Sequence, residues 1–142
     1  HHLVSGEILE NDKMLYRWFT EEEIRVMKEA VEDHRASSDH EPRSIYGKIV
    51  AEADRIIDPE ITLRRTVQYG LKQNPAENTE WHYNRFLNHL LNKYAEGGYL
   101  KLWFEHSKNG EKLRELRSLI NNREELRNVF NKIFEEETNL QI

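Results

Sequence analysis

Apolar side chains recur every three or four positions along most of the chain, which is the period of an α-helix with one buried face. We identify seven such stretches, and each predicts a helix. They cover residues 3–13, 20–34, 45–57, 61–72, 80–95, 111–120 and 123–136. Only the short stretch 99–104 fits a strand as well as a helix. The pattern therefore predicts an all-α protein.

Residues between the apolar stretches are typical of helix ends. Thr20 with Glu23 three positions later forms the pattern of a capping box, in which each side chain binds the other residue's backbone N–H. Ser44 is a favourable N-cap for the next helix. Pro59 requires either a break or the first turn of a new helix. Between the second and third helices, residues 35–43 form a polar loop.

Composition agrees with one helical domain. The 142 residues are 33% charged and 37% hydrophobic, and 6 glycines and 3 prolines are too few for a β-sandwich or a disordered chain. No apolar run approaches the roughly 20 residues that cross a bilayer, so we expect no membrane partner, and the lack of cysteine suits a cytoplasmic location. The net charge of -5 argues against a nucleic-acid polymer as partner. Because the sequence has no cysteine, a transition metal would need nitrogen and oxygen ligands.

Two polar residues continue the apolar stripes. By its own spacing, the stripe of the second helix ends at His34. In the third helix, Asp54 stands four positions after Val50 and three before Ile57. A buried carboxylate needs a cation or several hydrogen-bond donors, because desolvation of an unpaired charge is unfavourable. Histidine and aspartate together suit a divalent metal.

Each of these residues also has a structural interpretation. His34 could be a hydrogen-bonded histidine at a helix C-terminus, which the helix dipole favours. Asp54 could form a salt bridge with Lys48, Arg64 or Arg65. The spacing leaves both alternatives open.

Three runs of sequence surround these residues. They read A-V-E-D-H-R at 30–35, E-P-R-S-I-Y-G-K-I-V-A-E-A-D-R at 41–55 and I-T-L-R-R-T-V-Q-Y-G at 61–70. In their order and spacing they resemble the second half of the HD domain, which defines a superfamily of metal-dependent phosphohydrolases. The resemblance covers residues 3–70 well and the later helices more loosely.

The resemblance implies a fold and a domain organisation. Residues 1–142 would form a single HD-domain-like helical bundle. Its metal-site half would be residues 1–73, and residues 74–142 would be a C-terminal helical extension.

It also implies a metal site. Asp54 corresponds to the last metal ligand of the family. His34 corresponds to an additional histidine that faces the metal or the substrate phosphate in some members, and His2 to another if it is native. The metal would be divalent, namely Mn, Fe, Co, Mg or Zn. Asp54 and His34 are thus the predicted catalytic residues.

The activity implied is metal-dependent hydrolysis of a small phosphorylated substrate, such as a nucleotide or a related phosphoester. Arg65 would hold the phosphate, with Lys48 or Arg35 in support, because arginine binds phosphate oxygens in a bidentate manner. The sequence leaves open whether the protein forms a homo-oligomer.

One part of the family pattern is missing. The family's adjacent His-Asp pair does not occur in the sequence, and Asp33-His34 has the reverse order. In the family that pair precedes the region where this sequence begins, and His1 and His2 are either native or remnants of a tag. We expect a longer protein to supply the pair. The alternative is a catalytically inactive HD-like helical module that binds a ligand or a protein partner.

Overall fold

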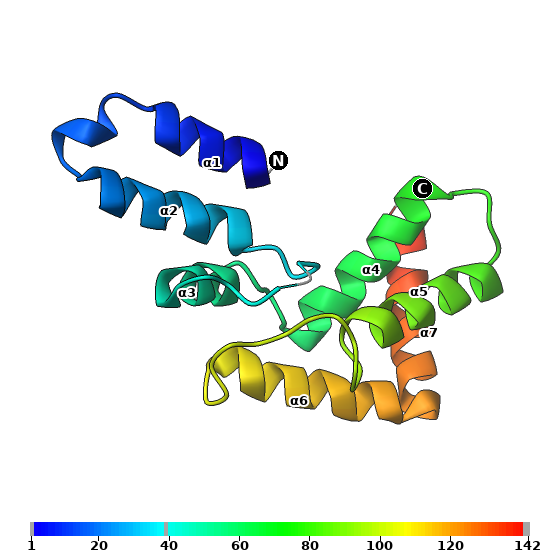
Figure 1. Cartoon of the computed structure of the whole chain (residues 1–142). Coiled ribbons are helices and arrows are strands. Elements are labelled where there is room, and N and C mark those ends of the chain that lie inside the picture. The colour runs from blue at the N-terminus through cyan, green and yellow to red at the C-terminus, as the bar shows by residue number, and fades with distance from the viewer. Residues whose placement is uncertain (1, 39, 141–142) are drawn as a thin grey trace. The chain divides into compact units, whose positions relative to one another are not determined.

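The computed structural model describes residues 2–38 and 40–140, and its regular structure is entirely helical (Figure 1). No strand occurs within these residues, so the all-α class predicted from the sequence is confirmed. Across the same residues, no helix combines the length and the apolar character needed to cross a membrane.

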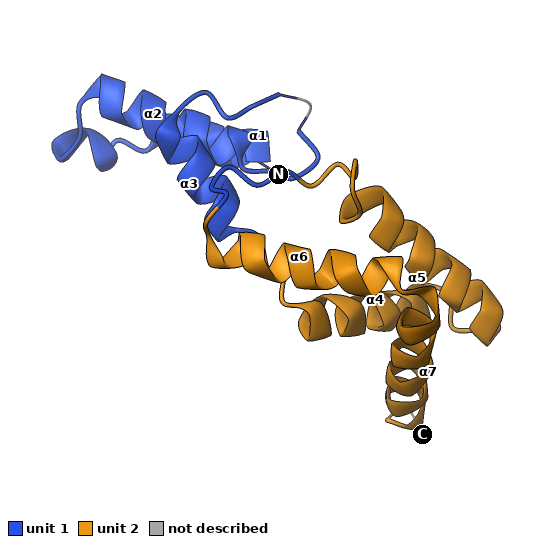
Figure 2. Ribbon diagram, turned by 90° about the horizontal axis from the view of Figure 1, so that it is seen from below, with its two compact units in different colours: residues 1–55, 101–105 blue, residues 56–100, 106–142 orange. Residues whose placement is uncertain are grey.

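The chain divides into two compact units, coloured separately in Figure 2. Unit 1 comprises residues 1–55 and 101–105, and unit 2 comprises residues 56–100 and 106–142. The helix that ends at residue 73 packs against later helices of unit 2.

Unit 1 contains α1 (His2–Asn11), a single 3-10 turn η1 (Leu15–Arg17), α2 (Glu21–Asp33) and α3 (Ile45–Ala53). Helix α2 contacts both α1 and α3. Figure 1 shows α1 and α2 side by side and running in opposite directions. The segment 101–105 completes the unit. Helix α2 is therefore the central element of unit 1.

The predicted helix starts in unit 1 are confirmed. The Glu23 N–H donates to the Thr20 hydroxyl at 3.3 Å, and the Thr20 N–H donates to the Glu23 carboxylate at 2.7 Å, which together form the capping box. The Gly47 N–H donates to the Ser44 hydroxyl at 3.2 Å and caps α3. These caps satisfy backbone donors that the first helical turn cannot.

Helix α3 packs through its small residues and not through its apolar stripe. Gly47 and Ala51 are buried. A methyl group at Gly47 would lie 3.0 Å from Pro42 Cβ, which is a tight contact, and 3.7 Å from Ala30 Cα, which is an ordinary one, so glycine eases the approach of α3 to the preceding loop. The large apolar side chains of α3 are instead exposed. These are Ile45, Tyr46, Ile49 and Val50. The prediction that this stripe is buried was wrong.

Unit 2 is built from α4 (Pro59–Gln73), α5 (Thr79–Lys93), α6 (Lys108–Asn121) and α7 (Arg123–Asn139). Helices α4 and α7 each contact the other three. Apolar side chains of all four helices are fully or almost fully buried. They include Leu63, Val67, Phe86, Leu90, Leu116, Ile120, Leu126 and Phe130. The four predicted apolar stripes therefore form one core in this unit.

Residues 99–104, which fitted either a helix or a strand, are neither. The chain turns after α5 through Gly97, whose φ of 78° lies in the left-handed region that favours glycine. The Tyr99 and Leu100 N–H groups then donate to the carbonyls of Asn92 and Lys93, both at 3.0 Å. These bonds close the turn and replace further helix.

His82 is a buried histidine within unit 2. Only 3% of it is exposed, and its ring lies 5.2 Å from the ring of Trp81 and 5.4 Å from that of Phe134. Among the described residues its Nε2 atom has no hydrogen-bond partner. Burial lowers the pKa of His82, and the positive charge of Arg85 lowers it further. The folded protein therefore favours the neutral imidazole.

We predict that acid destabilises the protein through His82. Its folded pKa is lower than its ordinary value of 6.5, so the unfolded chain binds the proton more tightly. This contribution to stability is complete above about pH 6.5 and is lost as the pH falls below it. Urea denaturation of wild type and His82→Gln at pH 7.5 and 5.5 should show a smaller pH dependence in the variant.

His106→Gln is the matched control, because His106 is an exposed histidine of the same unit. It should keep the pH dependence of wild type. Some dependence should remain in His82→Gln, since burial also lowers the pKa of His89. An unchanged pH dependence in His82→Gln would contradict the prediction.

Candidate functional site

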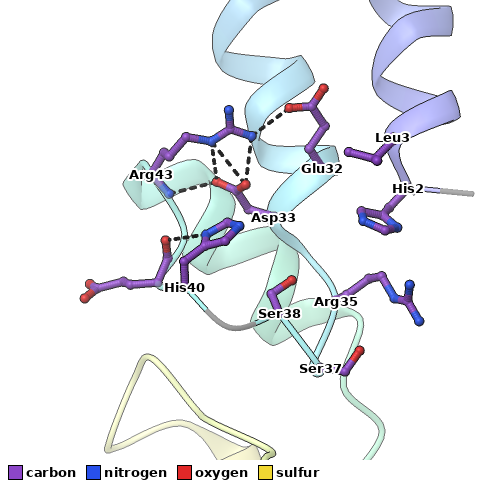
Figure 3. A pocket seen from close by; sticks show the side chains of 10 residues that line it. His2, Leu3, Glu32, Asp33, Arg35, Ser37, Ser38, His40 and Arg43 are labelled. Carbon is purple, nitrogen blue, oxygen red and sulfur yellow. Dashed lines mark hydrogen bonds and ion pairs between the residues drawn. The ribbon is translucent and has the colours of Figure 1, made fainter.

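A pocket of about 770 Å³ lies within unit 1 at the C-terminal end of α2 (Figure 3). Its walls come from the start of α1, the last turn of α2 and the loop that leads to α3. The lining residues are His2, Leu3, Glu32, Asp33, Arg35, Ser37, Ser38, His40, Glu41 and Arg43. Asp39, in the same loop, lies outside the described residues. The predicted site residues His2 and Arg35 thus face one pocket.

An ion pair between the buried Asp33 and the exposed Arg43 lines this pocket. The side chain of Asp33 is only 1% exposed. Arg43 Nε donates to both oxygens of Asp33, at 3.1 and 3.0 Å, and Arg43 Nη2 donates to Oδ1 at 2.8 Å. The backbone N–H of Arg43 adds a bond of 2.8 Å to Oδ2. Figure 3 shows this arrangement, with Arg43 also reaching Glu32.

Burial and the hydrogen bonds from Arg43 change the pKa of Asp33 in opposite directions. Burial raises the pKa of the carboxyl group, but the hydrogen bonds from Arg43 outweigh burial and leave the pKa below its ordinary value. Asp33 is therefore a carboxylate at neutral pH. The pair attaches the loop between α2 and α3 to the end of α2. Sequence reasoning did not identify either residue as part of the site.

His34 is the C-cap of α2. Its Nδ1 atom is hydrogen bonded to the carbonyl oxygen of Val31. A carbonyl oxygen only accepts, so Nδ1 must carry the hydrogen, and in the neutral ring Nε2 has the lone pair. This bond agrees with the structural interpretation of His34, in which it is a hydrogen-bonded histidine at a helix C-terminus. It is also the arrangement in which histidines that bind metals are usually held.

The structure places His2 next to His34. The centroids of the two rings are 6.5 Å apart, and the rings are nearly perpendicular. Partial burial lowers the pKa of His2, and the positive charge of Arg35 lowers it further. Neutral imidazole is the form that binds metals. His2, His34 and Arg35 therefore form the part of the predicted site that the fold brings together.

Asp54 does not have the environment that we expected. It is the C-cap of α3, where its N–H donates to the Val50 carbonyl at 3.0 Å, and its side chain is exposed. The expected burial is wrong because the buried side of the helix end carries Glu52 and Arg55. Among the described residues, no salt bridge joins Asp54 to the cations proposed as its structural partners.

The other two predicted phosphate ligands have different surroundings. Lys48 of α3 forms an ion pair with Glu41, and its ammonium lies 5.8 Å from the centre of the Trp103 ring. Arg65 of α4 is exposed and belongs to unit 2, where its neighbour Arg64 pairs with Glu136 and Glu137. Lys48 is therefore already paired with a carboxylate, whereas Arg65 is exposed to solvent.

No family model, curated protein or solved structure matches the sequence. Within residues 2–38 and 40–140, no three histidine or carboxylate side chains come together as a group that could hold a metal ion. The pocket and the sequence pattern are therefore the basis for a functional proposal.

We predict that Asp33→Asn destabilises the protein by about 1–3 kcal/mol, because the amide cannot accept all the bonds that Arg43 donates. Urea denaturation followed by tryptophan fluorescence measures this change. Glu22→Gln on the same helix is the control, since Glu22 forms an exposed ion pair with Arg25. Equal stability of Asp33→Asn and Glu22→Gln would show that the pair of Asp33 with Arg43 does not hold the loop.

Proposed function

We propose that this chain forms part of a metal-dependent phosphohydrolase that acts on a small phosphorylated substrate, such as a nucleotide or a related phosphoester. The observation that carries the proposal is the orientation of His34. Its Nδ1–H donates to the Val31 carbonyl, and the centre of a second imidazole ring, that of His2, lies 6.5 Å from the centre of its own. The HD-type sequence pattern around His34 and Asp54 supports the same function.

The residues present fit a divalent metal in their chemistry. His34 and His2 would supply nitrogen, and Asp54, whose carboxylate is exposed at the end of α3, would supply oxygen. Manganese, iron, cobalt, magnesium or zinc would suit such donors to different degrees. The remaining ligands would have to come from a further part of a longer protein, because residues 1–142 contain no adjacent His-Asp pair.

When bound, a divalent metal would lower the pKa of a bound water and so make hydroxide available closer to neutral pH. The chain's own residues would bind and orient the substrate. Arg35, exposed at the pocket, would hold the phosphoryl group through two parallel N–H bonds. Lys48 is a weaker candidate for this role because Glu41 already neutralises it, and Arg65, to which the sequence pattern assigned the role, belongs to unit 2.

A catalytically inactive helical module that binds a ligand or a protein partner is the second candidate. One observation favours it. The described residues contain no group of three potential metal ligands, and an inactive relative of such enzymes would have lost that group. The two candidates differ in metal content and in hydrolysis.

The test uses the full-length protein loaded with Mn²⁺ and a panel of nucleoside phosphates. We expect bound metal and release of inorganic phosphate. His34→Ala and Asp54→Ala should each lower metal affinity and the rate of hydrolysis by at least about 100-fold, the upper range for loss of groups that only support a ligand. Elemental analysis and a colorimetric phosphate assay provide the measurements.

The matched control is His106→Ala, which removes an exposed histidine of unit 2 and should leave both properties unchanged. Full activity in Asp54→Ala would remove Asp54 from the site. Wild-type protein with neither bound metal nor phosphate release would support the inactive module.

A further inference from the structure

The carboxylates of the described pocket wall are all paired with cations. Asp33 and Glu32 both bind Arg43, with closest distances of 2.8 and 2.7 Å. Glu41 forms an ion pair with Lys48. Their negative charges are therefore largely neutralised, and the Nε and Nη2 groups of Arg43 are already bonded.

Arg35 differs from the other charged groups of the pocket. It is exposed, and among the described residues its side chain forms no hydrogen bond or ion pair. Its guanidinium has five N–H donors in a planar fork. The hydroxyl groups of Ser37 and Ser38 line the same pocket and likewise have no side-chain hydrogen bond within the described part of the chain. One arginine and two hydroxyls thus remain as donors without an acceptor.

The C-terminal end of α2 carries a partial negative charge, which would disfavour a nearby anion. Two of its last carbonyls are already satisfied. The Val31 carbonyl accepts a bond from the His34 ring, and the Glu29 carbonyl accepts one from Arg43 at 3.5 Å. These bonds reduce the opposing charge at the pocket.

We propose that Arg35, Ser37 and Ser38 form a binding site for a terminal phosphoryl group, and that this site binds it without a metal. A terminal phosphoryl group offers three non-bridging oxygens, which matches a guanidinium fork together with two hydroxyls. The bonds between Asp33 and Arg43 hold the two ends of the loop that carries these donors. The choice of phosphate as the ligand rests on the proposed function.

The experiment is a titration of the ¹⁵N-labelled full chain with inorganic phosphate in the presence of EDTA, followed by NMR. We expect the amide signals of the loop at residues 35–38 to shift and saturate. Arg35→Gln should weaken phosphate binding at least about tenfold, since a hydrogen bond to a charged group contributes about 1.5–3 kcal/mol. Arg35→Lys should bind phosphate more weakly than wild type but more tightly than Arg35→Gln, because lysine keeps the positive charge but lacks the planar fork of N–H donors.

Arg17→Gln is the matched control, because Arg17 is an exposed arginine of the same unit outside the pocket. It should bind phosphate as wild type does. Equal loss of binding in Arg17→Gln, unchanged binding in Arg35→Gln, or the same shifts with sodium chloride at matched ionic strength would each overturn the proposal.

The result is independent of catalysis. Phosphate binding in EDTA without any metal-dependent hydrolysis would support this site and reject the proposed enzyme. Hydrolysis by the metal-loaded protein without phosphate binding in EDTA would reject this site and support the enzyme.

Discussion

A carboxylate that has almost no contact with water must be matched by a cation, and in unit 1 the side chain of Asp33 is matched by Arg43. The two residues are ten positions apart, so their bonds close the loop between α2 and α3. His34 and Arg35 directly follow Asp33 and lie at the anchored end of that loop. The arrangement of the candidate site therefore depends on a pair that takes no part in the proposed chemistry.

The helices could be predicted from the sequence because their causes are local. Thr20 and Glu23 need only each other to start α2, and Ser44 needs only the backbone of its own helix. The buried side of α2 was harder to predict, because Ala30 and Val31 are equally plausible core positions. The spacing from Val31 leads to His34, and the spacing from Ala30 leads to Asp33. The structure buries Ala30 and Asp33.

The predicted and the observed buried faces differ because burial depends on contacts between elements. The pattern within a single helix does not specify these contacts. Gly47 on α3 lies closely against Pro42 of the preceding loop and faces Ala30 of α2, so the small residues of α3 are buried and its large apolar residues remain exposed. Asp54 shares a face of α3 with these large apolar residues. Because that face is exposed, Asp54 is exposed too. The general argument that a buried carboxylate needs a cation holds for Asp33. The proximity of His2 and His34 depends on the pairing of α1 with α2, which spacing within one helix could not show.

The segment 101–105 has a consequence for the order in which the chain can fold. The Trp103 N–H donates to the Glu52 carboxylate at 3.0 Å, so unit 1 includes a contact between residues separated by the whole of α4 and α5. During synthesis from the N-terminus, the ribosome must pass residue 105 before the last contacts of unit 1 can form. The first helices are thus synthesised early, but the contacts of unit 1 are completed late. A protein truncated after α3 would lack part of the unit to which α3 belongs.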